Sequence, residues 1–245
     1  MDGERVDSER TTGEVEEVSE VREGDVEGSF LAHLTDVDRS LLLDRGVRRD
    51  FTANDTLLSE GDPSDHLHVI VSGWVRVSTL LEGGQEIIYA LRGPGDVLGE
   101  LAALNGWSRT ASVRGIEPVS VVQLSSAQFL AALHDRPGIA IALLKTMSTR
   151  LREAEMARIG SATLDVSMRL AKYLADLAVD RGRRSVDGVV IDSPLTQEDI
   201  ANHLGASRRA VARALGVLRS RGVVSTGRKR IVVHRPDVLR ALTRL

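Results

Sequence analysis

Cysteine is absent from the 245 residues of the chain. This absence excludes disulfide bonds, zinc sites with thiolate ligands, cysteine-ligated iron–sulfur clusters and a cysteine nucleophile. Redox sensing through a cysteine-bound cluster is excluded for the same reason. A chain without disulfides fits a reducing compartment, and the missing membrane span and signal peptide described next make the cytoplasm the expected location.

Long apolar runs are also missing. A helix that spans a bilayer needs about 18 or more consecutive apolar residues, and no stretch approaches that length although 42% of the residues are hydrophobic. The beginning, MDGERVDSERTTGEVEEVSE, lacks the basic and then apolar pattern of a secretory signal peptide. We therefore expect a soluble protein without a membrane partner, long enough for one large or two ordinary domains.

Positive charge is scarce outside the last third of the chain. Residues 1–28 carry 3 basic and 11 acidic side chains, residues 29–165 carry 13 and 17, and residues 166–245 carry 16 and 7. A basic segment on an otherwise acidic protein predicts that this segment binds a polyanion. A solvated charged surface is the alternative.

The pattern of apolar residues changes several times along the chain. Residues 1–28 show no sustained apolar period, which predicts a disordered acidic leader. A short helix is expected within residues 29–46. From Val47 to Leu124, short β-rich runs alternate with Gly, Asp and Pro, which predicts a compact antiparallel barrel or sandwich. We assign residues 29–136 to this domain.

A long helix is predicted after a break at Pro137 and Gly138. Apolar or small residues then recur with 3–4 spacing, at Ile141, Leu144, Ser148, Leu151 and Ala154 or Glu155. This spacing favours pairing with the same helix of a second copy, and a helix packed on its own barrel is the alternative. Because another amphipathic helix begins near Leu164, we expect a dimerisation helix over residues 137–164 and a last domain over residues 165–245.

The segment LTQEDIANHLGASRRAVARALGVLRSRGVV, residues 195–224, carries the most specific pattern. Thr196, followed three residues later by Asp199, predicts a capping-box-like helix start. Gly205 stands where a tight turn is needed, and Ser207 predicts the N-cap of a second helix. The expected inward residues are Ile200, Ala201 and Leu204 in the first helix, and Val211, Ala214, Leu215 and Leu218 in the second. Two short helices joined in this way predict a helix-turn-helix.

Basic side chains face outward from the second predicted helix, and others follow it. Arginines near the start of such a helix can donate two hydrogen bonds to O6 and N7 of guanine, or bind phosphates. The stretch VVSTGRKRIVVHR predicts two strands around a turn, in the form of a wing laid along a DNA backbone. A helical hairpin without a nucleic-acid role and a solvated hairpin tip are the alternatives. The predicted contacts to double-stranded DNA are Thr196, Ser207, Arg208, Arg209, Arg213, Arg228, Lys229 and Arg230.

A second constellation lies in GDVLGELAALNGWSRTASV, residues 95–113. A carboxylate in such an apolar run is costly unless it is paired, and Glu100 with Arg109 alone would form an inert structural pair. The alternative is a ligand that needs both groups. Arg109 and the Thr110 hydroxyl could bind a phosphate, and Glu100 could accept a hydrogen bond from a ribose 2′-hydroxyl. Glycines such as Gly99 let the backbone come close to the ligand and donate N–H groups to it. A cyclic nucleotide fits this set compactly.

The segments EGDPSDHLHVIVSGWVRV, GPGDVLGELAALNGWSRTASV and LTQEDIANHLGASRRAVARAL resemble, in matching order, the bacterial catabolite activator / fumarate-nitrate-reductase regulator (Crp/Fnr) family. The resemblance covers about Leu43 to Val233. It implies an α+β protein with a cyclic-nucleotide-binding β-roll (jelly-roll-like) sensor domain, a long helix that forms a homodimer, and a C-terminal winged helix-turn-helix that recognises a near-palindromic site. It also implies that Gly99, Glu100 and Leu101 line the ribose side, and that Arg109 and Thr110 hold the cyclic phosphate.

Two departures from the family pattern affect specificity. The Thr-Ser pair that faces adenine in the cAMP-responsive pattern is replaced by Ala154 and Glu155, although Glu155 can accept a hydrogen bond from an exocyclic amine. In the recognition helix the familiar Arg-Glu pair becomes Arg208-Arg209, with Arg213 retained. A donor replaces a carboxylate that could accept from cytosine N4, so the DNA sequence recognised should differ.

The sequence therefore predicts a DNA-binding transcription regulator, not an enzyme, with cAMP as the favoured effector and RNA polymerase as a further partner. A regulator of the same family that works without ligand, or with cGMP or a larger cyclic nucleotide, is the alternative. A more distant alternative is a cupin-like metal enzyme, because His66 and His68 have the spacing of a metal-binding pair. The rest of that site is missing, and surface histidines on a strand are the simpler interpretation.

Overall fold

Short antiparallel strands build the N-terminal domain, as the β-rich pattern from Val47 to Leu124 predicts. The computed structural model describes residues 28–63, 65–84, 86–180, 182–192, 195–227 and 230–242. The predicted acidic leader, except Gly28, and two predicted wing residues, Arg228 and Lys229, lie outside these ranges.

Two four-stranded sheets face each other in this domain, with the orders β1-β8-β3-β6 and β2-β7-β4-β5. Every neighbouring pair of strands is antiparallel. The strands are β1 (Val47–Phe51), β2 (Thr56–Leu58), β3 (His66–Ser72), β4 (Val75–Leu80), β5 (Glu86–Arg92), β6 (Val97–Leu98), β7 (Ser112–Gly115) and β8 (Val119–Ser125). Of the two predicted forms, an antiparallel barrel or a sandwich, the structure has the sandwich.

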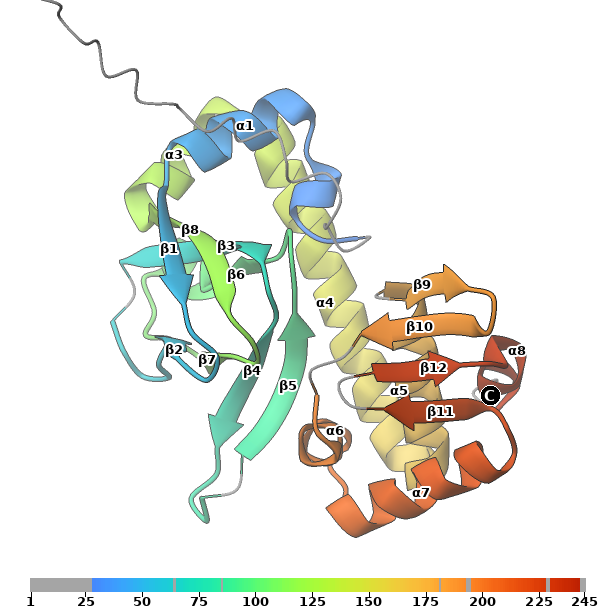
Figure 1. Cartoon of the computed structure of the whole chain (residues 1–245). Helices are drawn as coiled ribbons and strands as arrows, with labels where there is room; N and C mark the ends of the chain where they lie inside the picture. Colours follow the sequence, from blue (N-terminus) through green and yellow to red (C-terminus); the bar gives the residue numbers. More distant parts are fainter. Residues whose placement is uncertain are drawn as a thin grey trace, which may run out of the picture.

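Short helices cover one end of the sheets (Figure 1). They are η2 (Leu31–His33), α1 (Asp36–Asp44) and α3 (Ser126–Asp135). Ser125 starts α3 with a capping box, in which its hydroxyl accepts from Gln128 N–H and the Gln128 side chain accepts from Ser125 N–H. Phe30 and Phe129 meet edge to face in the core, with ring centroids 6.3 Å apart. The helices and the sheets thus share one apolar core.

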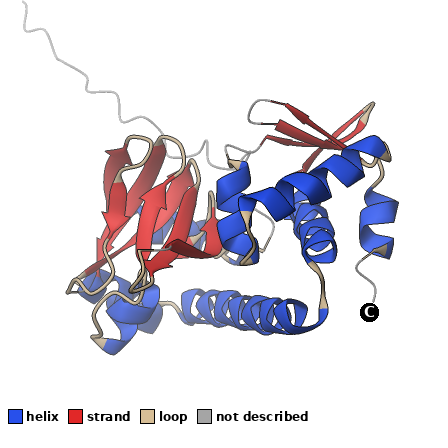
Figure 2. Ribbon diagram, turned by 90° about the horizontal axis from the view of Figure 1, so that it is seen from below, coloured by secondary structure: helices blue, strands red, loops and turns tan. Residues whose placement is uncertain are grey.

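The long helix α4 (Pro137–Thr163) begins with proline, whose missing N–H costs no helical hydrogen bond at this position. Figure 2 shows it running from the two sheets to the C-terminal domain. Its face against the N-terminal domain buries Ile139, Ala142 and Leu143. The predicted pairing face is exposed within the chain, at Ile141, Leu144 and Leu151. The helix therefore packs on its own domain and presents a second apolar face at the same time.

The C-terminal domain contains the predicted helix-turn-helix and a four-stranded antiparallel sheet with the order β11-β12-β10-β9. The elements are α5 (Val166–Asp180), β9 (Gly182–Ser185), β10 (Gly188–Asp192), α6 (Gln197–Leu204), α7 (Arg208–Ser220), β11 (Val224–Gly227), β12 (Arg230–Val233) and α8 (Pro236–Ala241). The wing strands β11 and β12 are those that the sequence predicts, whereas the β9–β10 hairpin was not predicted.

The helix boundaries in this domain follow the predicted caps. Thr196 accepts from Asp199 N–H at 3.1 Å, and Ser207 accepts from Ala210 N–H at 3.2 Å. Gly205 closes α6 in the left-handed conformation with φ 58°. All seven predicted inward residues are buried, namely Ile200, Ala201, Leu204, Val211, Ala214, Leu215 and Leu218. Within the described ranges, no helix has the length and apolar character needed to cross a membrane.

The two histidines of the metal-pair hypothesis lie on β3, and His68 is in the interior. Four consecutive residues of this strand, 67–70, are buried, so both of its faces are covered. The expectation that both histidines are surface residues is therefore wrong for His68, which is 1% exposed. Among the described residues, no group of three His, Asp or Glu side chains is placed to hold a metal.

Burial of His68 predicts a loss of stability in acid. Its pKa is lowered to about 4, first by burial and then by the charges of His66 and Arg109. An unfolded histidine titrates near 6.5, so the unfolded state binds the proton more tightly, and the free energy of unfolding falls as the pH drops from about 6.5 to about 4. We expect this residue to account for about 3 kcal/mol between these limits.

Urea unfolding at about pH 7.5 and about pH 4.5 checks this expectation. The variant His68→Gln keeps a polar side chain without a titrating proton. In this variant, the free energy of unfolding should differ less between the two pH values than it does in the wild type. An equal pH difference in the variant and the wild type would contradict the assignment.

Candidate functional site

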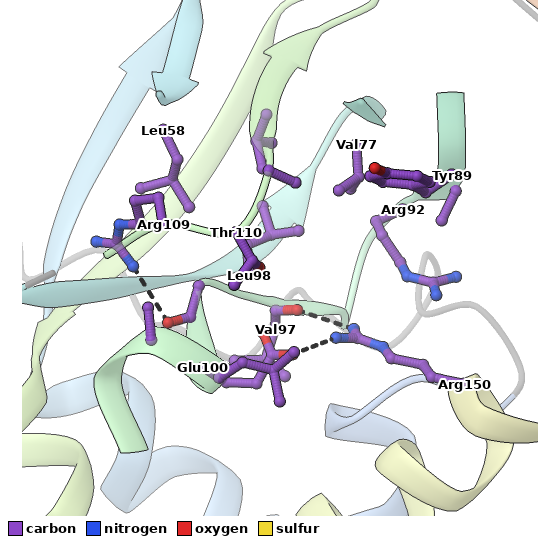
Figure 3. A pocket seen from close by; sticks show the side chains of 16 residues that line it. Leu58, Val77, Tyr89, Arg92, Val97, Leu98, Glu100, Arg109, Thr110 and Arg150 are labelled. Atoms are coloured by element: carbon purple, nitrogen blue, oxygen red, sulfur yellow. Dashed lines mark hydrogen bonds and ion pairs between the residues drawn. The ribbon is translucent and has the colours of Figure 1, made fainter. Parts of the chain in front are cut away.

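A cavity of about 380 Å³ opens in the N-terminal domain beside α4 (Figure 3). Its wall is formed by strands β2, β4, β5, β6 and β7, the helix α2 (Glu100–Asn105), the segment before β7, and α4. Its lining residues are Leu58, Val77, Tyr89, Ala90, Arg92, Val97, Leu98, Gly99, Glu100, Leu101, Ala102, Arg109, Thr110, Ala111, Val113 and Arg150. Five of the six predicted ligand residues are therefore brought together, although which of them bind a ligand stays a prediction.

Gly99 occupies a position that other residues do not fit. It precedes α2 with φ 79°, in the left-handed region that favours glycine. A Cβ atom at this position would lie 2.4 Å from Nη1 of Arg109. The glycine therefore permits both the turn into α2 and the close approach of the guanidinium.

Arg109 is buried and held in place by main-chain oxygens. Its Nη1 donates to the Gly99 carbonyl at 3.1 Å, and its Nη2 donates to the His66 carbonyl at 2.6 Å. Burial lowers the pKa of the guanidinium, while the neighbouring carboxylates of Asp65, Asp62 and Glu100 oppose this effect. An arginine stays charged despite such a shift. A fixed, desolvated cation with further N–H donors is suited to an anion.

Glu100 has a partner that the sequence analysis missed. Arg150 of α4 donates from Nη1 to Oε1 of Glu100 at 2.9 Å, and from Nη2 to the Val97 carbonyl at 2.8 Å. The same Nη2 lies 3.3 Å from Oδ1 of Asp96. The carboxylate in the apolar run is thus paired with α4 rather than with Arg109, and Arg150 ties the long helix to the cavity wall.

A third arginine, Arg92, reaches the cavity from β5. Its Nη2 lies 3.2 Å from Oε2 of Glu153 on α4. In Figure 3, Arg92 and Tyr89 lie at the end of the cavity away from Arg109. The cavity lining therefore holds three guanidinium groups and one carboxylate, a balance that favours an anionic or acceptor-rich ligand.

Glu155 is the predicted ligand residue that the cavity does not include. It lies exposed on α4, and it is absent from the lining of the cavity in the single chain. The role of Glu155 toward a ligand therefore stays a prediction.

The predicted DNA-contact residues that are described lie at exposed positions or helix starts. Arg208, Arg209 and Arg213 are exposed on α7, and Arg230 is exposed at the start of β12. The hydroxyls of Thr196 and Ser207 serve as caps of α6 and α7. These arginines are thus exposed to solvent, the two hydroxyls begin the helices, and contact of either group with DNA stays a prediction.

Comparisons with known proteins agree with this division into two domains. The model of the cyclic nucleotide-binding domain matches residues 48–136, and that of the Crp-like helix-turn-helix domain matches residues 168–242. The chain is 33% identical over 184 residues to a CRP-like cAMP-activated global transcriptional regulator of Mycobacterium tuberculosis, covering 75% of this chain and 82% of the relative. The chain belongs to the Crp/Fnr family of transcription regulators.

Other Crp/Fnr relatives carry different names. The chain is 32% identical over 195 residues to the global nitrogen regulator of Nostoc sp., with 79% of this chain and 87% of the relative covered. The solved structure of FixK2 from Bradyrhizobium japonicum has a TM-score of 0.73 at 23% identity, covering 82% of this chain and 98% of that chain. The latter likeness concerns the fold, and it confirms the predicted α+β architecture of this Crp/Fnr protein.

Proposed function

We propose that the chain is a homodimeric, sequence-specific transcription regulator whose affinity for DNA is set by a cyclic nucleotide, with cAMP as the first candidate. One observation carries the proposal. The cavity of about 380 Å³ is lined together by Gly99, Glu100, Leu101, Arg109 and Thr110, the residues expected from the sequence. Its volume lies within the range of about 300–1,000 Å³ that is typical of small-molecule sites.

The chemistry of the lining supports one orientation of the nucleotide. The cyclic phosphate would lie at Arg109 and Thr110, where a buried cation and a hydroxyl are adjacent. The ribose 2′-hydroxyl would donate to Glu100, whose carboxylate is fixed by Arg150. The base then extends toward Tyr89 and the far end of the cavity. Each part of the ligand thus meets groups of matching hydrogen-bonding character.

A ligand other than cAMP is the second candidate. The pattern that faces adenine is replaced by Ala154 and Glu155, and Arg92 adds a guanidinium to the end of the cavity opposite Arg109. A relative from Mycobacterium tuberculosis is named as cAMP-activated, whereas others are named global nitrogen regulators. Three other outcomes must be separated by experiment: regulation by cGMP, regulation by a larger cyclic nucleotide, and DNA binding without any ligand.

Calorimetric titration of nucleotide-stripped protein with cAMP, cGMP and a cyclic dinucleotide tests the proposal. Trp107, two residues from Arg109, offers a fluorescence signal in parallel. Saturable heat with cAMP at micromolar concentration supports it, and binding of only another nucleotide moves the assignment to that ligand. No binding of any of them, together with DNA binding by the same preparation, would leave a ligand-independent regulator.

The exposed apolar face of α4 supports the homodimer. Ile141, Leu144 and Leu151 follow the 3–4 spacing that brings residues onto one side of a helix, as in a coiled coil. In such a dimer two helix-turn-helix units would meet successive major-groove turns of near-palindromic DNA. Nucleotide binding would shift the population of the two units toward the arrangement that fits DNA. We further propose a cytoplasmic location and RNA polymerase as a partner.

Charge placed on this face should dissociate the dimer. In Leu144→Glu/Leu151→Glu, apposed carboxylates would have to be buried, so we expect a monomer by sedimentation at concentrations where the wild type is dimeric. The affinity of the double variant for operator DNA should fall as the dimer is lost. Val37→Glu is a matched control, because Val37 on α1 is 64% exposed and Leu144 is 66% exposed. A double variant that sediments like the wild type would place the interface elsewhere.

A further inference from the structure

Strands β4 and β5 lie between the cavity and the C-terminal domain, and we call this pair of strands the β4–β5 wall. Arg76 is opposite Leu91 in their register, and Val77 is opposite Ala90. Because successive residues of a strand point to opposite faces, these two pairs face opposite ways. Val77 and Ala90 line the cavity. The other face, with Arg76 and Leu91, meets the C-terminal domain, and α6 lies beside β5 (Figure 1).

Arg76 makes the charged contact across this face. Its Nη1 lies 3.1 Å from Oδ1 of Asp199 on α6, and its Nε lies 3.3 Å from Oε1 of Glu86 on β5. Ser78 donates to the same Glu86 oxygen at 2.6 Å. The side chains of Arg76 and Asp199 are only 16% and 12% exposed. Glu86 on β5 therefore holds the Arg76 guanidinium in place, and the same guanidinium contacts Asp199 on α6.

Asp199 links this contact to the start of α6. Its Oδ2 accepts from the Thr196 N–H at 2.8 Å and from the Thr196 hydroxyl at 2.7 Å, which completes the capping box. Its Oδ1 accepts from Arg76. The two carboxylate oxygens thus have separate partners, one that begins the helix and one on the sensor domain. Since α6 and α7 share one apolar core, a shift of α6 carries the basic helix with it.

We propose that Arg76 is a positioning residue, which holds the helix-turn-helix on the β4–β5 wall through Asp199 and links occupancy of the cavity to DNA binding within one subunit. A ligand that contacts Ala90 or Arg92 on one face of the wall displaces Arg76 and Leu91 on the other. The cavity and the DNA-binding helices are coupled only as strongly as the ligand prefers one position of the β4–β5 wall over another. The linkage to nucleotide rests on the proposed function, whereas the contact itself does not.

Hydrogen exchange in the full chain tests the contact without nucleotide. Arg76→Ala removes the cation, and Asp199→Asn removes the carboxylate charge while keeping a side chain that can still cap α6. Backbone amides of β5 and α6 should exchange faster in both variants. Arg45→Ala is the control, because Arg45 pairs with Asp135 at 3.1 Å within the N-terminal domain. Wild-type exchange rates in Arg76→Ala would overturn the positioning role.

The linkage is measured as the ratio of operator affinity with and without saturating cAMP, and again with cGMP. We expect the ratio to fall at least about threefold in Arg76→Ala and Asp199→Asn, and no further in the double variant, because both changes remove one interaction. The ratio should be unchanged in Arg45→Ala. An unchanged ratio in Arg76→Ala overturns the linkage. Absence of nucleotide binding in the wild type overturns the proposed effector and the linkage, and the exchange experiment still decides the positioning role.

Discussion

Replacing Arg109 by alanine is expected to weaken cyclic-nucleotide binding by at least about 100-fold, which corresponds to about 3 kcal/mol. A cyclic phosphate that faces this buried guanidinium would lose a charge-assisted hydrogen bond in a site of low dielectric constant. Calorimetry with the nucleotide that binds the wild type measures the loss. Arg109→Lys should recover only part of the affinity, because an ammonium cannot reproduce the planar fork of donors.

The same side chain also supports the cavity wall, so the fold of the variant must be verified. Arg109 donates to the carbonyls of Gly99 and His66, and alanine leaves both without this donor. Thermal unfolding of the variant shows whether the domain is intact. Arg114→Ala is a matched control, since Arg114 lies on β7 with its Nε donating to Thr56, and it does not line the cavity. Wild-type affinity in a folded Arg109→Ala would contradict the phosphate assignment.

Replacing Arg213 by alanine is expected to remove most of the preference for operator over other DNA. A bidentate contact between an arginine and guanine discriminates against the wrong base by about 1–3 kcal/mol. The proposed homodimer would make this contact twice, so the ratio of specific to non-specific affinity should fall at least about 30-fold. Competition binding between a selected operator and random DNA at one salt concentration measures this ratio.

Arg230 provides the contrasting variant, because it lies exposed at the start of β12 in the wing. In Arg230→Ala, binding to all sequences should weaken alike, and the slope of log affinity against log salt should decrease by about one for each phosphate that the side chain no longer neutralises. The sequence predicts the same behaviour for Lys229. If Arg213→Ala retained the wild-type specificity ratio, α7 would not be the recognition helix.

The parts of the site that the sequence predicted are those whose interactions are local. Thr196 caps α6 through Asp199, three residues away, and Ser207 caps α7 in the same way. Such caps are visible as short spacings. Gly99 and Glu100 are likewise followed within one short segment by Arg109, so a single stretch of sequence supplies most of the cavity lining that was predicted.

The contacts that the sequence did not reveal connect distant positions. Arg150 is 50 residues from Glu100, and Arg92 is 61 residues from Glu153. Helical periodicity shows which side of α4 is apolar, but it does not show which strand lies opposite an arginine on the other side. The β9–β10 hairpin was missed as well. Its strand β9 consists of a glycine, two arginines and a serine, residues that offer no apolar alternation to detect.

The attachment of Arg150 to the cavity wall also gives α4 a mechanical property. From Arg150 to Thr163 the helix continues for 14 residues without a break, a rise of about 20 Å. A tilt about the anchored arginine therefore moves the far end of the helix by about 0.3 Å for every degree. Because Glu153, one turn further along α4, is also held by Arg92, we expect a small tilt of the helix at the cavity wall to become a larger displacement where α5 begins.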